Sequence, residues 1–166
     1  MKFYTMLATL IISLFFINTV EAQTFAANQK ESLRGLNAML LVVDFVQDAL
    51  VIEEVNREQL ELEIRRRMAA NGIRNMSEAE WARSEGVPYL HVYLNTIRSE
   101  MGFFTYRIEV NLSQEIILKR NRSVSMMAPT WQTGTLGAIG VGRLADLRTE
   151  ILHLVDIFLE DHKSVN

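Results

Sequence analysis

Apolar and polar residues alternate most regularly in two neighbouring stretches near the middle of the chain. In residues 104–113, Phe104, Tyr106, Ile108, Val110 and Leu112 fall on one side, and the residues between them are polar. A period of two predicts an antiparallel strand with one face in water. The stretch 89–98 alternates in the same way, so we expect a hairpin closed by the turn at 99–102. The second strand should continue through residues 115–120, with a bulge near Gln114.

Two other stretches have the period of a helix. Leu60, Ile64 and Met68 recur every fourth residue between residues 57 and 70. Asn56, with Gln59 three residues later, has the pattern of an N-cap, and Asn71-Gly72 that of a C-terminal cap. A second amphipathic helix of about five turns should begin near residue 144 and fray near Lys163. Its apolar stripe consists of Leu144, Leu147, Ile151, Leu154, Val155 and Phe158.

The remaining segments give shorter signals. The continuous apolar run 36–46 favours a buried strand, and residues 47–55 are expected as a connection. Ser77 to Glu80 has the pattern of a capping box that opens a short helical piece carrying Trp81. Residues 124–131 are expected to return as a strand, and Pro129 would place that strand at a sheet edge.

These elements predict the α+β class. The expected architecture is a two-layer sandwich, with a mostly antiparallel sheet of about four strands and two main helices packed on one face. The order is strand-helix-strand-strand-strand-helix. The first strand is joined to the rest through a helix, so it should pair in parallel by a right-handed crossover. We expect one domain at 35–162, preceded by a flexible lead-in at 23–34.

The amino terminus predicts export. Lys2 precedes the apolar run 6–17, which as a helix would span about 18 Å, short of the roughly 30 Å hydrocarbon core. Val20 and Ala22 suit a small-residue cleavage site, so residues 1–22 are interpreted as a signal peptide. We therefore expect a periplasmic or secreted protein. No later apolar run approaches spanning length, so no membrane span is expected after signal cleavage.

Composition excludes several functions. The chain has no cysteine, which excludes disulfides, catalytic thiols and a lipid anchor on cysteine. The net charge is −3 with no basic stripe, so we expect no nucleic-acid partner. The three histidines lack metal-ligand spacing, and no nucleophile motif surrounds a serine, so neither a metal, a cofactor nor a catalytic residue is predicted.

One candidate surface lies on the polar side of the predicted hairpin. Tyr89, His91 and Tyr93 alternate with the apolar residues of the first strand, and Arg107 and Glu109 lie on the corresponding side of the second. Such an aromatic and polar face could recognise a partner or a sugar. An ordinary solvated face or a homodimer interface explains the same pattern, since tyrosine is common in both.

A second candidate is the glycine-rich segment Trp131–Arg143, with Gly134, Gly137 and Gly140 before an amphipathic helix. Phosphate-loop and dinucleotide patterns are absent. Backbone N–H groups at a helix start, beside Arg143, could still bind an anion. The alternative is a flexible turn whose glycines let the neighbouring apolar residues pack.

The chain resembles a family of uncharacterised small exported bacterial (periplasmic) proteins. The resemblance rests on the stretches ESLRGLNAMLLVVDFV, PYLHVYLNTI, TYRIEVNLSQEIILKR, APTWQTGTLGAIG and LRTEILHLVDIFLEDHKSVN. The order of elements is also similar to the amino-terminal domain of TolB and to curli-secretion-type periplasmic domains. That resemblance implies work through protein contacts in the envelope.

The sequence therefore favours an exported, non-catalytic binding or envelope-assembly module. Its expected partner is an envelope protein or a second copy, engaged by strand addition to a sheet edge. The alternative is a small anionic-ligand binder, or a hydrolase, that uses residues 131–143.

Overall fold

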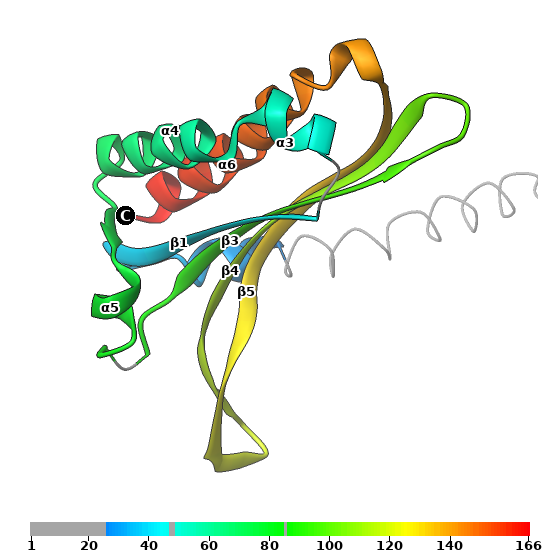
Figure 1. Ribbon diagram of the computed structural model, residues 1–166. Helices are drawn as coiled ribbons and strands as arrows, with labels where there is room; N and C mark the ends of the chain where they lie inside the picture. Colours follow the sequence, from blue (N-terminus) through cyan, green and yellow to red (C-terminus); the bar gives the residue numbers. More distant parts are fainter. Residues whose placement is uncertain (1–25, 47–48, 85) are drawn as a thin grey trace, which may run out of the picture.

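The computed structural model describes residues 26–46, 49–84 and 86–166, so the predicted signal peptide lies outside the described residues. Two helices, α4 and α6, cover one face of a five-stranded sheet whose strand order is β2-β1-β3-β4-β5 (Figure 1). The elements are β1 (Ala38–Val46), α3 (Ala49–Val55), α4 (Arg57–Ala70), β2 (Arg74–Met76), α5 (Glu78–Trp81), β3 (Tyr89–Arg98), β4 (Phe103–Leu118), β5 (Asn121–Gly140), the 3-10 turn η1 (Val141–Arg143) and α6 (Asp146–Val165).

The predicted fold class is confirmed, and the sheet is mixed. β1 pairs in parallel with both β2 and β3, whereas β3, β4 and β5 are antiparallel. The parallel pairing of the first strand agrees with the expected crossover. The fifth strand, β2, was not predicted, because its three residues are too few to show a period. It forms by pairing with Ala38–Leu40 directly after α4.

The glycine-rich segment is a strand and not a loop. β5 runs to Gly140 and pairs with β4 as far as Phe103, so Trp131, Gly134 and Gly137 are strand residues. The interpretation of this segment as a loop or flexible turn was wrong for residues 131–140, and the turn is confined to 141–143. Glycine has a low strand propensity, and the pairing with the long strand β4 overrides it. Pro129 does lie in an edge strand, as predicted.

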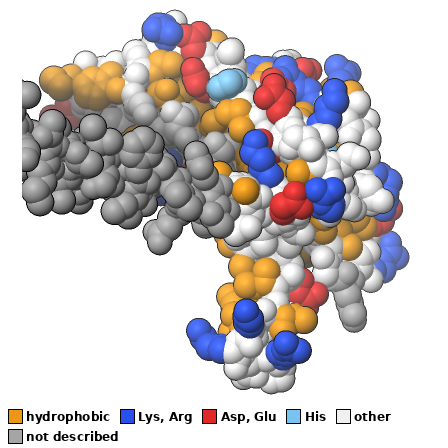
Figure 2. Space-filling model, turned by 180° about the vertical axis from the view of Figure 1, so that it is seen from behind, with side chains coloured by type: hydrophobic (Ala, Val, Ile, Leu, Met, Phe, Trp, Pro, Cys, Tyr) orange, Lys and Arg blue, Asp and Glu red, His pale blue; other side chains and the backbone are white. Residues whose placement is uncertain are grey.

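The far part of β4 and β5 extends beyond the rest of the sheet. β3 pairs with β4 only up to Ser113, after which β4 and β5 pair with each other alone. We call this two-stranded extension, residues 114–128, the arm. It projects away from the helices (Figure 1), and Figure 2 shows it as a narrow protrusion in the space-filling view. A register shift at Leu112/Ser113 begins the arm, close to the bulge expected near Gln114.

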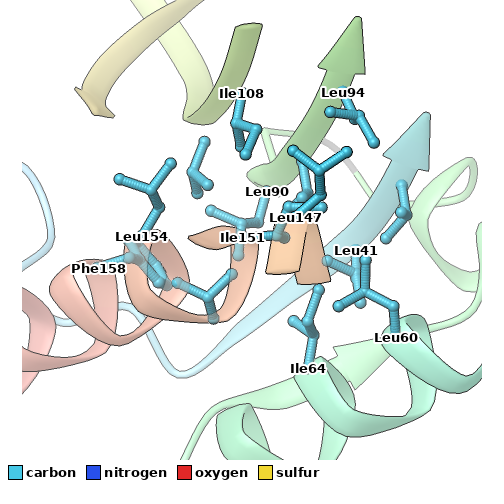
Figure 3. Close-up of a cluster of buried hydrophobic side chains, with 14 of the residues drawn as sticks. Leu41, Leu60, Ile64, Leu90, Leu94, Ile108, Leu147, Ile151, Leu154 and Phe158 are labelled. Atoms are coloured by element: carbon cyan, nitrogen blue, oxygen red, sulfur yellow. The ribbon is translucent and has the colours of Figure 1, made fainter. Parts of the chain in front are cut away.

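The core lies between the helices and the sheet (Figure 3). α4 begins and ends where the sequence predicts, and the Asn56 side chain accepts a hydrogen bond from the Gln59 N–H at 3.1 Å. The buried residues of α4 are Leu60, Ile64 and Met68, and those of α6 include Leu147, Ile151, Leu154, Val155 and Phe158. They pack on the predicted apolar face of β3 and β4. Full burial of each such side chain stabilises the fold by about 1.5–3 kcal/mol.

The end of α6 is ordered further than expected. The helix continues to Val165 and does not fray at Lys163. The Asn166 side chain donates to the Leu33 carbonyl at 3.0 Å and accepts from the Gly35 N–H at 2.6 Å. His162, expected near a frayed end, is buried, and its Nε2 donates to the Leu36 carbonyl at 2.6 Å.

Residues before the expected domain start also take part in the fold. Residues 26–31 are helical, and the Leu33 side chain is fully buried. The Ser32 hydroxyl donates to the Thr130 carbonyl at 3.3 Å, and the Gln29 side chain accepts from the Gln132 N–H at 3.2 Å. The segment expected as a flexible lead-in is therefore packed against β5.

Candidate functional site

The sheet face opposite α4 and α6 carries the first candidate surface, which we call the open face. The predicted alternation is confirmed in β3, where Leu90, Val92 and Leu94 are fully buried and the residues between them are half-buried. Strand register aligns polar side chains of adjacent strands on this face. It includes Asp44, Tyr89, His91, Tyr93, Asn95, Arg107, Glu109, Asn111, Gln132 and Leu136.

A histidine–aspartate pair lies on the open face. The His91 Nε2 is 2.8 Å from the Asp44 Oδ2, and the His91 and Tyr93 rings are 5.8 Å apart. The sequence indicates His91 and Tyr93 as candidate residues but does not predict the pair with Asp44. The signal was Asp44 itself, since an acidic residue that interrupts an apolar strand must lie on its solvated side. The pair holds the imidazole in place, and among the described residues no serine or threonine hydroxyl forms a hydrogen bond with it.

An open groove crosses β4 and β5 on the same face. Its volume is about 770 Å³. Arg107 and Glu109 form an ion pair beside it, and Glu109 lies opposite Tyr93 in the sheet register. The groove is lined by Arg107, Ile108, Glu109, Asn111, Gln132, Gly134 and Leu136 among others, so its walls are both polar and apolar and its outer rim is the edge strand.

β5 forms one edge of the sheet, and the described residues leave part of that edge without a protein partner. The Gln132 N–H and the Thr130 carbonyl point outward, because both bond to the segment 26–34. Backbone groups of a strand alternate in direction, so those of Gly134, Leu136 and Ala138 also point outward. Among the described residues no donor or acceptor meets the outward groups of these three. We call residues 134–138 the free edge.

The free edge lacks the features that usually protect such strands. Natural edges carry charges, prolines or bulges that prevent pairing with another chain. The sequence from Trp131 to Gly142 contains no charged residue and no proline. The Leu136 side chain is 78% exposed. This stretch is therefore an uncharged strand with an apolar side chain in water.

The glycines of this strand have separate structural roles. A Cβ on Gly134 would lie 2.7 Å from the Ile108 carbonyl oxygen, and one on Gly137 would lie 2.6 Å from the Tyr106 hydroxyl oxygen. The Tyr106 ring therefore occupies the space beside Gly137. A Cβ on Gly140 would meet nothing within 4 Å. Close approach to β4 requires the first two glycines.

Two of the predicted site residues lie away from the open face. Trp131 is 2% exposed, packs against Phe158 on the helix side and donates from its indole N–H to Asp161 at 3.0 Å. Arg143 is exposed in η1 and pairs with Asp146 in the first turn of α6 at 2.7 Å. Of the predicted residues, His91 and Tyr93 are therefore neighbours on the open face, and Tyr89 and Arg107 lie further along it in opposite directions. Trp131 is part of the core, and Arg143 pairs with a carboxylate of its own chain.

Two charged side chains with shifted pKa values lie away from the open face. The pKa of Glu80 is lowered by hydrogen bonds from Ser77, and the pKa of Arg67 is raised by its hydrogen bond to Asp156. These groups lie on α5 and α4. Within the described residues no three histidine, aspartate or glutamate side chains gather as a metal site. Nor does the described part of the chain contain a helix long and apolar enough to cross a membrane.

No protein-family model and no curated protein matches the chain. Among solved structures, it is similar to a PelC variant from Paraburkholderia phytofirmans that was solved as a dodecamer. That similarity has a TM-score of 0.42 and 16% identity, and it covers 78% of this chain and 90% of the other. A minor lipoprotein from Acinetobacter baumannii is similar with a TM-score of 0.33 and 10% identity, over 77% and 93% of the two chains. Neither likeness assigns a role to a residue.

Proposed function

We propose that this protein is an exported, non-catalytic binding module that pairs its free edge with an extended protein segment. The single observation that supports the proposal is the outward backbone of Gly134, Leu136 and Ala138, which the described residues leave without a partner. Strand addition uses such main-chain groups for affinity and neighbouring pockets for side-chain selectivity.

The groove beside the free edge suits the side chains of an added strand. Alternate side chains of a strand paired with residues 134–138 would point to the open face. There they would meet the rim of the groove near Leu136 and Gln132. The Arg107–Glu109 pair and Asn111 offer donors and acceptors within the same groove. The expected partner is therefore an extended segment whose side chains on one side fit a groove with polar and apolar walls.

Either another envelope protein or a second copy of the chain meets this requirement. Two copies can pair edge to edge about a two-fold axis, because each offers the same uncharged strand. Sedimentation velocity over a range of concentrations separates self-association from binding to another protein.

The test uses the chain from Gln23 and the variant Leu136→Lys. The Leu136 side chain is mostly in water, so lysine there keeps the fold and places a charge on the edge. Leu62→Lys on α4 is the matched control, since Leu62 is 49% exposed and lies on another surface. We expect Leu136→Lys to abolish the complex that wild type forms, with itself or with a protein captured from envelope extract. Leu62→Lys should leave that complex intact.

Hydrogen exchange identifies the contact directly. The amides of Gly134, Leu136 and Ala138 should exchange fast in the uncomplexed monomer and slowly in the complex. A complex that leaves these amides unprotected, or that Leu136→Lys does not weaken, contradicts the proposal. A chain that remains monomeric and captures nothing contradicts it too.

A further inference from the structure

The arm combines features that the proposed edge pairing does not use. From Ile116 to Met127 it carries three basic residues, Lys119, Arg120 and Arg122, and no acidic residue. The whole chain has a net charge of −3. All three cations are exposed, and none forms an ion pair within the described part of the chain. The arm therefore ends in a local positive charge on an acidic protein.

Apolar side chains lie directly behind these cations. Ile116 and Met126 are cross-strand partners on one side of the ribbon, and a register shift after Ile117 separates them from Leu118 and Val124 nearer the tip. Val124 is 38% and Met126 49% exposed. On the other side Ile117 is 64% exposed. Figure 2 shows apolar side chains along the arm and basic side chains at its end.

The shape of the arm restricts what can bind it. It is a two-stranded ribbon paired within itself that projects away from α4 and α6, and its base lies beside residues 81–84 and 86–87, so the apolar side chains nearer its tip have no core to cover. Apolar side chains are exposed on both sides of the ribbon, so a partner that surrounds the tip would cover all of them. A flat protein surface would cover only one side.

We propose that the arm contacts a lipid bilayer surface that carries anionic headgroups. The cations would attract the headgroup phosphates, and Ile117, Val124 and Met126 would enter the boundary between headgroups and acyl chains. Attachment to such a surface takes both an apolar and an electrostatic contribution. The ribbon pairs only the inward backbone groups of its two strands, so the outward N–H and C=O groups keep the tip among the hydrated headgroups and out of the hydrocarbon core.

The experiment is co-sedimentation of the chain from Gln23 with vesicles. One set contains phosphatidylglycerol mixed with phosphatidylcholine, and the other contains phosphatidylcholine alone. We expect binding to the anionic vesicles only, weakened by added salt because exposed charges are screened. The triple variant Lys119→Gln, Arg120→Gln and Arg122→Gln should bind on the order of 100-fold more weakly.

Two further variants make the result specific to the arm. The matched control Arg57→Gln, Arg66→Gln and Lys163→Gln removes the same charge from exposed helix positions and should bind within a few-fold of wild type. The double change Val124→Ser and Met126→Ser keeps the charge and should also weaken binding. Urea unfolding of each variant verifies that the fold is retained.

Several results would overturn the proposal. These are absence of vesicle binding, equal binding to both vesicle types, and equal loss in the arm triple and the helix triple. If the arm triple loses a protein partner while its vesicle binding is unchanged, the arm binds an acidic protein instead. Leu136→Lys should bind vesicles as wild type does, so failure of the edge proposal and failure of this one are distinguishable.

Discussion

The clearest quantitative prediction concerns two glycines that the sequence pattern presents as equivalent. Gly134 and Gly140 occur in the same glycine-rich stretch, and both become alanine in the test. At Gly134 the new Cβ would lie 2.7 Å from the Ile108 carbonyl oxygen, which is backbone and cannot rotate away. At Gly140 the backbone is extended, with φ −75 and ψ 154, and the space around the Cβ is empty.

The two changes should therefore have opposite signs. Overpacking against backbone costs about 1–3 kcal/mol, so Gly134→Ala should destabilise the protein. Alanine restricts the unfolded chain, so Gly140→Ala should stabilise it by about 0.4–1 kcal/mol. Gly137→Ala should fall between them, because its obstacle is the far end of the Tyr106 side chain. For a chain of this size, 1 kcal/mol corresponds to roughly 2–4 °C in melting temperature.

Urea unfolding followed by circular dichroism measures these differences. Equal slopes against urea show that only the free energy of unfolding has changed. The steric reasoning is refuted if Gly134→Ala is as stable as wild type, or if Gly140→Ala is destabilised as much as Gly134→Ala. The second outcome would instead mean that the whole segment needs glycine flexibility.

Three other predictions follow from particular contacts. Trp131→Phe keeps an aromatic ring but removes the five-membered ring of a buried indole and its hydrogen bond to the carboxylate on α6, so the free energy of unfolding should fall by about 2–4 kcal/mol in urea titrations. Arg143→Ala breaks only an exposed pair with Asp146, so its cost should stay below about 0.5 kcal/mol. Inorganic phosphate should change the melting temperatures of wild type and this variant equally, and a rise in wild type alone would revive the anion-site hypothesis. The pKa of Glu80 is lowered from 4.5 by hydrogen bonds from Ser77, so its carboxylate stabilises the fold at neutral pH. The stability gap between wild type and Glu80→Gln should be present at pH 7 and close as the pH falls below about 4.5, and a gap independent of pH would disprove the role of the charge.

Local signals explain what could be predicted from the sequence. The Asn56 cap and the four-residue spacing of Leu60 and Ile64 lie within a few turns of one helix. α4 begins and ends as predicted. The Ser77–Glu80 capping box is present with both of its hydrogen bonds. Strict alternation likewise gave the bounds of β3. Each of these patterns depends on residues that are close in the sequence.

Pairing between distant segments explains what could not be predicted. β2 exists because Arg74–Met76 meets β1, and the second half of β5 is a strand because β4 is long enough to pair with it. The Asp44–His91 contact depends on the register of two parallel strands joined by a long crossover. The sequence indicates which side chains face the solvent but does not contain that register.

The position of the segment 26–34 has a consequence for selectivity. Its bonds to Thr130 and Gln132 occupy the strand edge on one side of Gly134, and η1 ends the strand on the other. An incoming strand therefore meets a slot of fixed length, about 17 Å for five residues. Sliding by two residues in either direction would lose hydrogen bonds at one end of the slot. Only one alignment of the partner therefore forms every hydrogen bond that the free edge offers. A short motif that fits this alignment is favoured over any longer extended sequence.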